Sequence, residues 1–397
     1  MVFIVRMVNA MKRGNPFNTS QTARPFELVN RTKETLTFES FLDSTMRRSP
    51  VNLAIVGIRG IGKTSLLAKF EELAVGNKCI VVRLEGEEGR FDSVFKIYKE
   101  ILTGINIELT KRHAARKLSK KVEEFLERYS FTLSVGDIGL KIEKGEQAGE
   151  EPYPAVFREK MLEVWENVKK ETPAIVFMID EAEYLEQIRG ALMALRNTFS
   201  RLGEKQAGYM LILSGRLSFH KEMSEIFSPL TRFFHPLELG PLEEKDVRQL
   251  VKLHLSKTGV SIEDKCVKKI AENSQGHPYV VLVMGRVLYN NLPEKERVIT
   301  ALLYEKSTKD ILEYLAAELF SGMYNKLSET EKRIVRLIAG EGGKLKTGEI
   351  AKKLRIDYGP LSPYLNNLQK KGAVIKKKRG EYEIFHKLFG NYALEQN

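Results

Sequence analysis

The chain has 397 residues, which is too long for one hydrophobic core, so we expect two or three domains. Its content of 43% hydrophobic and 29% charged residues excludes a natively disordered protein. The only cysteines, Cys79 and Cys266, exclude a disulfide framework and a cysteine-based zinc site. The longest apolar runs are shorter than the roughly 18 residues of a membrane helix, so we expect a cytoplasmic protein with no membrane partner.

The positive charge is concentrated near the C-terminus. Residues 326–397 hold 16 Lys/Arg and 8 Asp/Glu, so they carry +8 of the total net charge of +12. A basic excess confined to one segment favours a separate module with a polyanionic partner. The alternative is a solvated basic surface that aids solubility, which charge alone does not exclude.

The chain begins with residues 1–25, which lack clear periodicity and are expected to form a mobile lead-in. From residue 26 to 240, short apolar segments rich in branched side chains alternate with helical stretches. This alternation predicts an α/β domain built on a parallel sheet. The expected strands are Leu53–Val56, Cys79–Leu84, Ala174–Ile179, Met210–Leu213 and Phe233–Leu239.

Residues 104–154 interrupt the alternation, and we interpret them as an inserted element. Residues 111–129 are a basic stretch with apolar side chains at helical spacing, and residues 131–144 alternate as in a hairpin. The sequence leaves open whether this insert contacts DNA, another partner or only its own domain. Residues 241–325 have a helical pattern with no convincing strand.

A glycine-rich segment, Gly57-Ile58-Arg59-Gly60-Ile61-Gly62-Lys63-Thr64, follows the first expected strand and precedes a helical stretch. It fits the P-loop pattern, in which glycines let backbone N–H groups face phosphate at a helix N-terminus. We expect Lys63 to neutralise the β- and γ-phosphates of ATP, and the Thr64 hydroxyl to bind Mg²⁺. The expected nucleotide contacts are Gly57, Gly60, Ile61, Gly62, Lys63, Thr64 and Ser65.

Two acids follow the strand expected at Ala174–Ile179. Asp180 is expected to bind Mg²⁺ together with Thr64, and Glu181 to activate the attacking water, which favours ATP hydrolysis. The alternative is that both acids cap the next helix. The following strand leads into Arg216, which can reach the γ-phosphate or can form a surface salt bridge.

Together these motifs resemble the archaeal ATPase group of the AAA+-related STAND P-loop NTPases. The resemblance covers residues 25–314 and implies a P-loop parallel sheet followed by a helical lid domain at 241–325. It implies that Arg31 helps to enclose the adenine, although Asn30 stands where the family usually has glycine. It also gives Arg216 a sensor role and gives Arg232 the role of an intersubunit arginine finger, which would require self-association.

The segment Gly276-His277-Pro278 is similar to the lid motif of this family, in which the proline lies against the base. The resemblance therefore implies that Pro278 is part of the nucleotide site. No second histidine lies near His277 at metal-ligand spacing, so we expect it to cap a helix or line the nucleotide.

Residues 326–397 resemble a winged helix-turn-helix. Ser328 and Glu331 form a capping box before an apolar helical face, two further helices follow, and a hairpin with a basic tip ends the pattern. We expect the third helix to enter the DNA major groove and the tip to contact the backbone. Winged helices also dock proteins, and that alternative stays open. The expected DNA contacts are Ser362, Asn366, Asn367, Lys376, Lys377, Lys378 and Arg379.

The sequence therefore predicts an ATP-hydrolysing, DNA-binding protein in which the nucleotide sets the pose of the winged helix. The alternative is a nucleotide-gated signalling or regulatory switch whose winged helix binds protein.

Overall fold

The computed structural model describes residues 14–19, 28–87, 89, 91–112, 117–127, 153–226 and 228–396. They form two compact units. The sheet unit comprises Arg31–Val56 and Leu66–Glu238, and the lid–wing unit comprises Met1–Asn30, Gly57–Ser65 and Leu239–Asn397. The hairpin expected at 131–144 lies outside the described residues. None of the described helices is long and apolar enough to cross a membrane.

The sheet unit is built on five parallel strands in the order β2-β3-β4-β1-β5. Every residue of β1, β3 and β4 is buried, because parallel strands are covered on both faces. That double burial explains the continuous apolar runs in the sequence, and all five expected strands are confirmed with ends within two residues. The strands are β1 Asn52–Val56, β2 Ile80–Glu85, β3 Ile175–Asp180, β4 Tyr209–Gly215 and β5 Phe234–Glu238.

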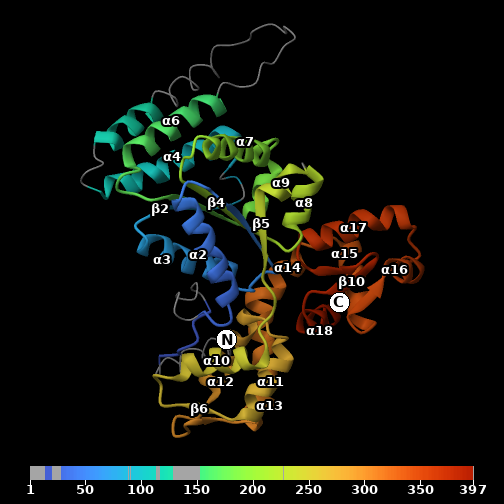
Figure 1. Ribbon diagram of the computed structural model, residues 1–397. Coiled ribbons are helices and arrows are strands. Elements are labelled where there is room, and N and C mark those ends of the chain that lie inside the picture. The colour runs from blue at the N-terminus through green and yellow to red at the C-terminus, as the bar shows by residue number, and fades with distance from the viewer. Residues whose placement is uncertain are drawn as a thin grey trace. The chain divides into compact units, whose positions relative to one another are not determined.

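Helices cover both faces of this sheet (Figure 1). α4, α6 and α7 lie on one side, and α2 and α3 lie on the other, where the rings of Phe38 and Phe70 stack 4.1 Å apart. Residues 117–127 are helical with Leu118 and Val122 buried, as their apolar spacing predicted, whereas Lys111 and Arg112 at the start of the expected basic stretch are not helical. The bounds are α2 Thr32–Met46, α3 Lys63–Gly76, α4 Val94–Thr110, α6 Tyr153–Val168, α7 Ala191–Glu204, α8 Phe219–Ile226, α9 Pro229–Phe233 and the 3₁₀ helix η4 Ala182–Gln187.

The lid part of the lid–wing unit is helical, as expected. It also holds a two-stranded parallel pair, β6 Ser261–Ile262 and β7 Val298–Ile299, which was not expected because two residues carry no periodic signal. The helices are α10 Glu244–Leu255, α11 Asp264–Ser274, α12 Pro278–Asn291, α13 Ala301–Leu315, the π-helical turn η5 Ala316–Phe320 and α14 Ser321–Asn325.

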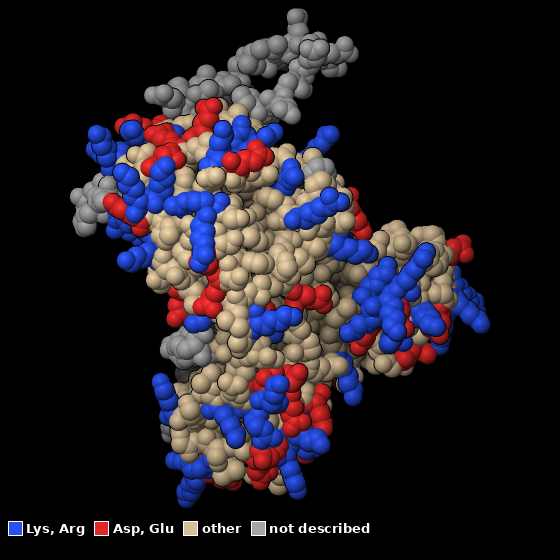
Figure 2. Space-filling model, in the orientation of Figure 1, with Lys and Arg blue, Asp and Glu red and all other residues tan. Residues whose placement is uncertain are grey.

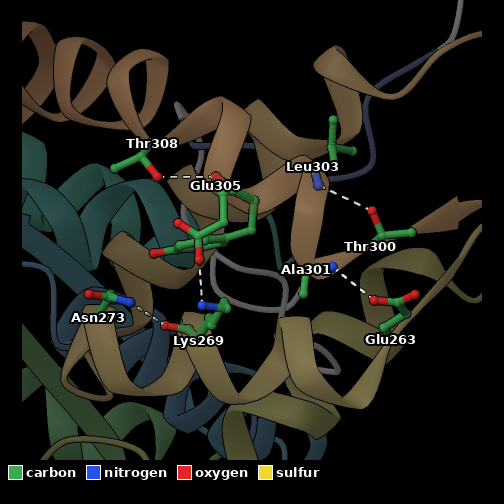
Figure 3. Close-up of polar contacts among 9 residues, drawn as sticks. Glu263, Lys269, Asn273, Thr300, Ala301, Leu303, Glu305 and Thr308 are labelled. Atoms are coloured by element: carbon green, nitrogen blue, oxygen red, sulfur yellow. Dashed lines mark hydrogen bonds and ion pairs between the residues drawn. The ribbon is translucent and has the colours of Figure 1, made fainter.

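Polar contacts hold α11 against the start of α13 (Figure 3). The Glu263 carboxylate accepts the backbone N–H of Ala301 at 2.8 Å, and the Thr300 hydroxyl accepts a second first-turn N–H at 3.1 Å. Lys269 and Glu305 form an ion pair between the two helices. The beginning of α13 is thus capped both by its own Thr300 and by the residue that precedes α11.

A short N-terminal segment, residues 14–19, is anchored in the lid. Phe17 is fully buried and stacks on His254 with ring centroids 5.2 Å apart, and a Cβ at Gly285 would overlap the Phe17 ring. The Asn15 amide donates to the carbonyl of Arg286 at 2.9 Å. The mobile lead-in expected at 1–25 therefore does not extend to these six residues.

The C-terminal module is a winged helix, as expected, with an antiparallel sheet in the order β8-β10-β9. The Ser328–Glu331 capping box is present, and the strand β8 and the final helix α18 were not expected. Phe320 packs with Phe385 and Phe389, so the winged helix shares one hydrophobic core with the lid. The elements are α15 Glu329–Gly340, β8 Lys344–Lys346, α16 Thr347–Leu354, α17 Tyr358–Lys370, β9 Val374–Lys378, β10 Glu381–Ile384 and α18 Lys387–Glu395.

Candidate nucleotide and DNA sites

The P-loop has the backbone that its glycines predict. Gly60 and Gly62 adopt φ angles of 74° and 100°, which favour glycine over other residues. A Cβ at Gly57 would lie 2.8 Å from Cγ2 of Ile61, so the loop is also too tight there for a side chain. Nothing lies within 4 Å of a Cβ built at Gly62.

The polar groups around this loop are of the chemical types that bind phosphate. The Lys63 ammonium donates to the carbonyls of Gly57 at 3.1 Å and Ile58 at 3.2 Å. Thr64 is exposed and Ser65 half-buried in the first turn of the 14-residue helix α3, where backbone N–H groups have no helical partner. An ammonium, two hydroxyls and a helix N-terminus form a donor set that fits nucleotide phosphates with a hydroxyl-bound Mg²⁺.

A turn at residues 274–278 contacts the P-loop. His277 is 2% exposed, and its Nε2 lies 2.6 Å from the carbonyl oxygen of Arg59, so Nε2 carries the proton. The backbone N–H of Tyr279 donates to the carbonyl of Gly60 at 3.4 Å. Burial, with a smaller contribution from His386, lowers the pKa of His277 to about 3, so the ring is neutral. Pro278 is the first residue of α12 beside this contact.

The same turn contacts the winged helix on another side. His386 Nε2 lies 3.0 Å from the carbonyl oxygen of Ser274, and the N–H of Lys387 donates to Oε1 of Gln275 at 2.9 Å. The rings of His277 and His386 meet edge to face with centroids 5.8 Å apart. Residues 274–278 thus lie between the P-loop and the start of α18. No sequence motif pointed to His386.

The backbone at Asn30, just before the sheet unit, explains why this chain can have asparagine where the family it resembles usually has glycine. Asn30 adopts a φ angle of 53°, a conformation that asparagine tolerates better than most residues, and its amide donates to the Asp246 carboxylate at 2.6 Å. It therefore replaces the usual glycine without loss of the turn. In the sheet unit, Arg31 is buried and lies 3.6 Å from Glu34.

The acidic pair lies at the carboxyl end of β3. Asp180 is buried, and its Oδ1 accepts the N–H of Glu181 at 3.1 Å. Glu181 has a φ angle of 48°, a strained conformation for glutamate of the kind found at functional sites. Gly86 donates its N–H to the carbonyl of Asp180 at 2.8 Å, and a Cβ there would overlap the carbonyl of Glu181. Sequence reasoning missed Gly86, because nothing local distinguishes it.

Arg216 follows β4, as expected, but carboxylates surround it. Its guanidinium forms ion pairs with Glu186 and Glu222, and its Nε donates to the Ser218 hydroxyl at 3.3 Å. Burial raises the pKa of Glu186 to about 7 despite the opposing effect of Arg216. These two glutamates were not singled out from the sequence. Arg232, in α9, is exposed and forms no ion pair among the described residues.

The expected DNA-binding residues gather on the winged helix. Asn366 and Asn367 are exposed on α17, and Ser362 is half-buried on the same helix. The four basic residues of the wing, 376–379, are all exposed around a turn at Gly380 with a φ angle of 74°. Figure 2 shows Lys and Arg side chains concentrated over this module. Lys377 is the one of these residues that pairs with an acid, at 3.5 Å from Glu383.

Within the described residues, no group of three or more His, Cys, Asp and Glu side chains could hold a metal ion. A protein-only metal cage is therefore absent from that part of the chain. A P-loop magnesium site does not need one, because nucleotide phosphates and water supply most of the ligands.

The parallel sheet, the P-loop and the acidic end of β3 define a P-loop ATPase fold with a helical lid and a winged helix. The family model described as the AAA ATPase domain matches residues 27–213 of this chain.

Over more than nine-tenths of its length the chain is similar to several archaeal proteins. It is 21% identical over 369 residues to an uncharacterized HTH-type transcriptional regulator of Methanocaldococcus jannaschii, covering 91% of this chain and 86% of the relative. The Walker-type ATPase PABY2304 of Pyrococcus abyssi has the same fold, with a TM-score of 0.66 at 18% identity over 95% of this chain and 99% of that one. The Aeropyrum pernix ORC2 protein gives a TM-score of 0.62 at 15% identity over 97% and 96% of the two chains.

Proposed function

We propose that this protein is a Mg²⁺-dependent ATPase that binds DNA through its winged helix, and that the bound nucleotide sets the pose of that winged helix. The observation that carries the proposal is the turn at 274–278, which contacts the P-loop through His277 and the winged helix through Ser274 and Gln275.

ATP binding rests on the P-loop, with Lys63 on the phosphates and Arg31 and Pro278 beside the base. Thr64 and Asp180 hold Mg²⁺, which supplies charge neutralisation on the phosphate oxygens when bound. Glu181 orients the attacking water and accepts its proton. The P-loop follows β1 directly, Asp180 ends β3 and Glu181 follows it, and the carboxyl ends of parallel strands share one edge of a sheet.

Coupling to the winged helix follows from the contacts of one carbonyl. The Arg59 carbonyl belongs to the P-loop, and it accepts a hydrogen bond from the buried His277 side chain. A phosphate that reorders the P-loop backbone moves this acceptor, and the close ring contact passes the displacement to His386 at the start of α18. The winged helix then changes its pose with the nucleotide state.

DNA binding is supported by the exposed face of α17 and by the exposed basic wing. The asparagines fit hydrogen bonding to base edges, and the wing cations fit phosphate contacts. The names of two similar proteins, an HTH-type transcriptional regulator and an ORC2 protein, agree with a role on DNA.

The two arginines have separate roles in this proposal. Arg216 reaches the γ-phosphate only when ATP draws it away from Glu186 or Glu222. Arg232, exposed on α9, is available to the nucleotide site of a neighbouring subunit, so ATP should promote self-association that Arg232→Ala abolishes in sedimentation.

A nucleotide-gated switch with a protein-docking winged helix is the second candidate. The observation that favours it is the engagement of Arg216 by two carboxylates, because an ATPase without its sensor arginine turns over slowly. Such a switch would bind ATP but would not bind DNA.

The test is ATP hydrolysis by the full-length protein with and without duplex, single-stranded and branched DNA. We expect DNA-stimulated turnover that is lost in Lys63→Ala, which weakens nucleotide binding, and in Glu181→Gln, which retains it. His386→Ala should keep DNA-independent hydrolysis and lose the stimulation. Negligible turnover together with no DNA binding at moderate salt would replace this proposal with the switch.

A further inference from the structure

A second basic site lies in the sheet unit, at the opposite edge of the sheet from the acidic pair. A pocket of about 310 Å³ opens there between the end of α4, the helix at 117–127 and the end of α6. Thr172 precedes β3, whereas Asp180 ends it, and a six-residue strand spans roughly 20 Å. The lining residues are Arg112, Lys117, Leu118, Lys121, Asn167, Val168, Glu171 and Thr172.

The Arg112 guanidinium is held in a fixed position in this pocket. Nη1 donates to the Thr172 hydroxyl at 2.6 Å, and Nη2 donates to the carbonyl of Cys79 at 3.3 Å. Thr172 is 1% exposed, so the anchor is buried. These bonds use two of the five N–H donors of an arginine, and the others remain for a ligand.

Two lysines add to this charge from one helix. Lys117 and Lys121 are exposed, line the pocket, and lie four residues apart, which brings them to the same helix face. Lys117 forms no ion pair among the described residues. Lys121 lies 3.7 Å from Glu163, but that carboxylate accepts a closer bond from Lys160 at 2.6 Å. Glu171 is the one acid among the lining residues, so the lining carries a net charge of +2.

We propose that this pocket binds a phosphate group. Lys117 and Lys121 repel each other because they are like charges four residues apart on a helix, and an anion bound between these lysines and Arg112 offsets that repulsion. The Asn167 amide donates one N–H to the carbonyl of Glu163 at 2.7 Å, which leaves its second N–H for a ligand. The lining holds no aromatic ring for a base to stack on, so the phosphate rather than a base is recognised. Lys111 and Lys120, which neighbour the lining residues in the sequence, are also exposed and extend the positive field around the pocket. The phosphate comes from a nucleic-acid backbone or from a small phosphorylated molecule, and the experiment separates these sources.

The test compares two double variants of the full-length protein. Lys117→Ala/Lys121→Ala removes two lining cations, and Lys111→Ala/Lys120→Ala removes the same charge from neighbouring positions that do not line the pocket. Pyrophosphate binding is measured by calorimetry with Lys63→Ala added, so that the P-loop does not contribute. Duplex DNA binding is measured by anisotropy over a range of salt concentrations.

We expect the pocket variant alone to weaken pyrophosphate binding about tenfold or more, because charge-assisted hydrogen bonds are lost. If the source is DNA, its slope of log K against log salt also falls by about 2. A loss confined to pyrophosphate identifies a small phosphorylated ligand, and a loss of pyrophosphate binding together with a lower DNA slope identifies the nucleic-acid backbone. The proposal is overturned if both double variants behave alike in both assays. Failure of the winged-helix proposal would leave the pyrophosphate result unchanged.

Discussion

Protonation of His277 should destabilise the folded protein at acidic pH. Burial holds the pKa of this ring at about 3, below its ordinary value of 6.5. As the pH falls, the ring of His277 therefore becomes protonated near pH 6.5 in the unfolded chain but only near pH 3 in the folded chain. The contribution to stability is complete above pH 6.5 and is lost as the pH falls toward 3. At pH 5 the loss is about 2 kcal/mol, from roughly 1.4 kcal/mol per pH unit.

The assay is urea unfolding of the native protein and His277→Gln at pH 7.5 and pH 5. Glutamine can still donate to the Arg59 carbonyl but does not titrate. The contributions of all other ionisable groups to the free energy of unfolding are the same in both proteins and cancel in the comparison. We expect the native protein to lose about 2 kcal/mol more than the variant between the two pH values. Equal pH dependence in the two proteins would refute a buried, neutral His277 between the P-loop and the winged helix.

Three further outcomes are expected. Gly86→Ala should reduce kcat more than ATP affinity, because its Cβ displaces the carbonyl of Glu181; an unchanged kcat would show that this backbone is free to shift. Phe17→Ala should destabilise the lid by about 3–5 kcal/mol in thermal unfolding, as for a fully buried ring, and a loss below about 1 kcal/mol would contradict the anchored N-terminal segment. Alanine at all four wing positions, 376–379, should lower the salt slope of DNA binding by about 3–4, whereas an unchanged slope would exclude the wing from the contact.

The sequence by itself determined the features that depend on contiguous residues. Buried parallel strands are continuous apolar runs, so β1 to β5 were evident from composition and spacing. The P-loop is specified by its own glycines, whose positive φ angles need no distant partner. The capping box at Ser328 is equally local, because its two side chains satisfy N–H groups of the same helix turn.

The tertiary structure alone decided which distant residues meet. Glu186 and Glu222 carry no pattern that links them to Arg216, and only the packing of η4 and α8 brings both to one guanidinium. His277 and His386 are more than a hundred residues apart, and their contact arises because the winged helix packs on the lid through a shared core. Side-chain periodicity indicates which face of a helix or strand is buried, but it does not indicate which other element packs against that face. That choice depends on the complementarity of whole surfaces, which forms only when the chain is folded.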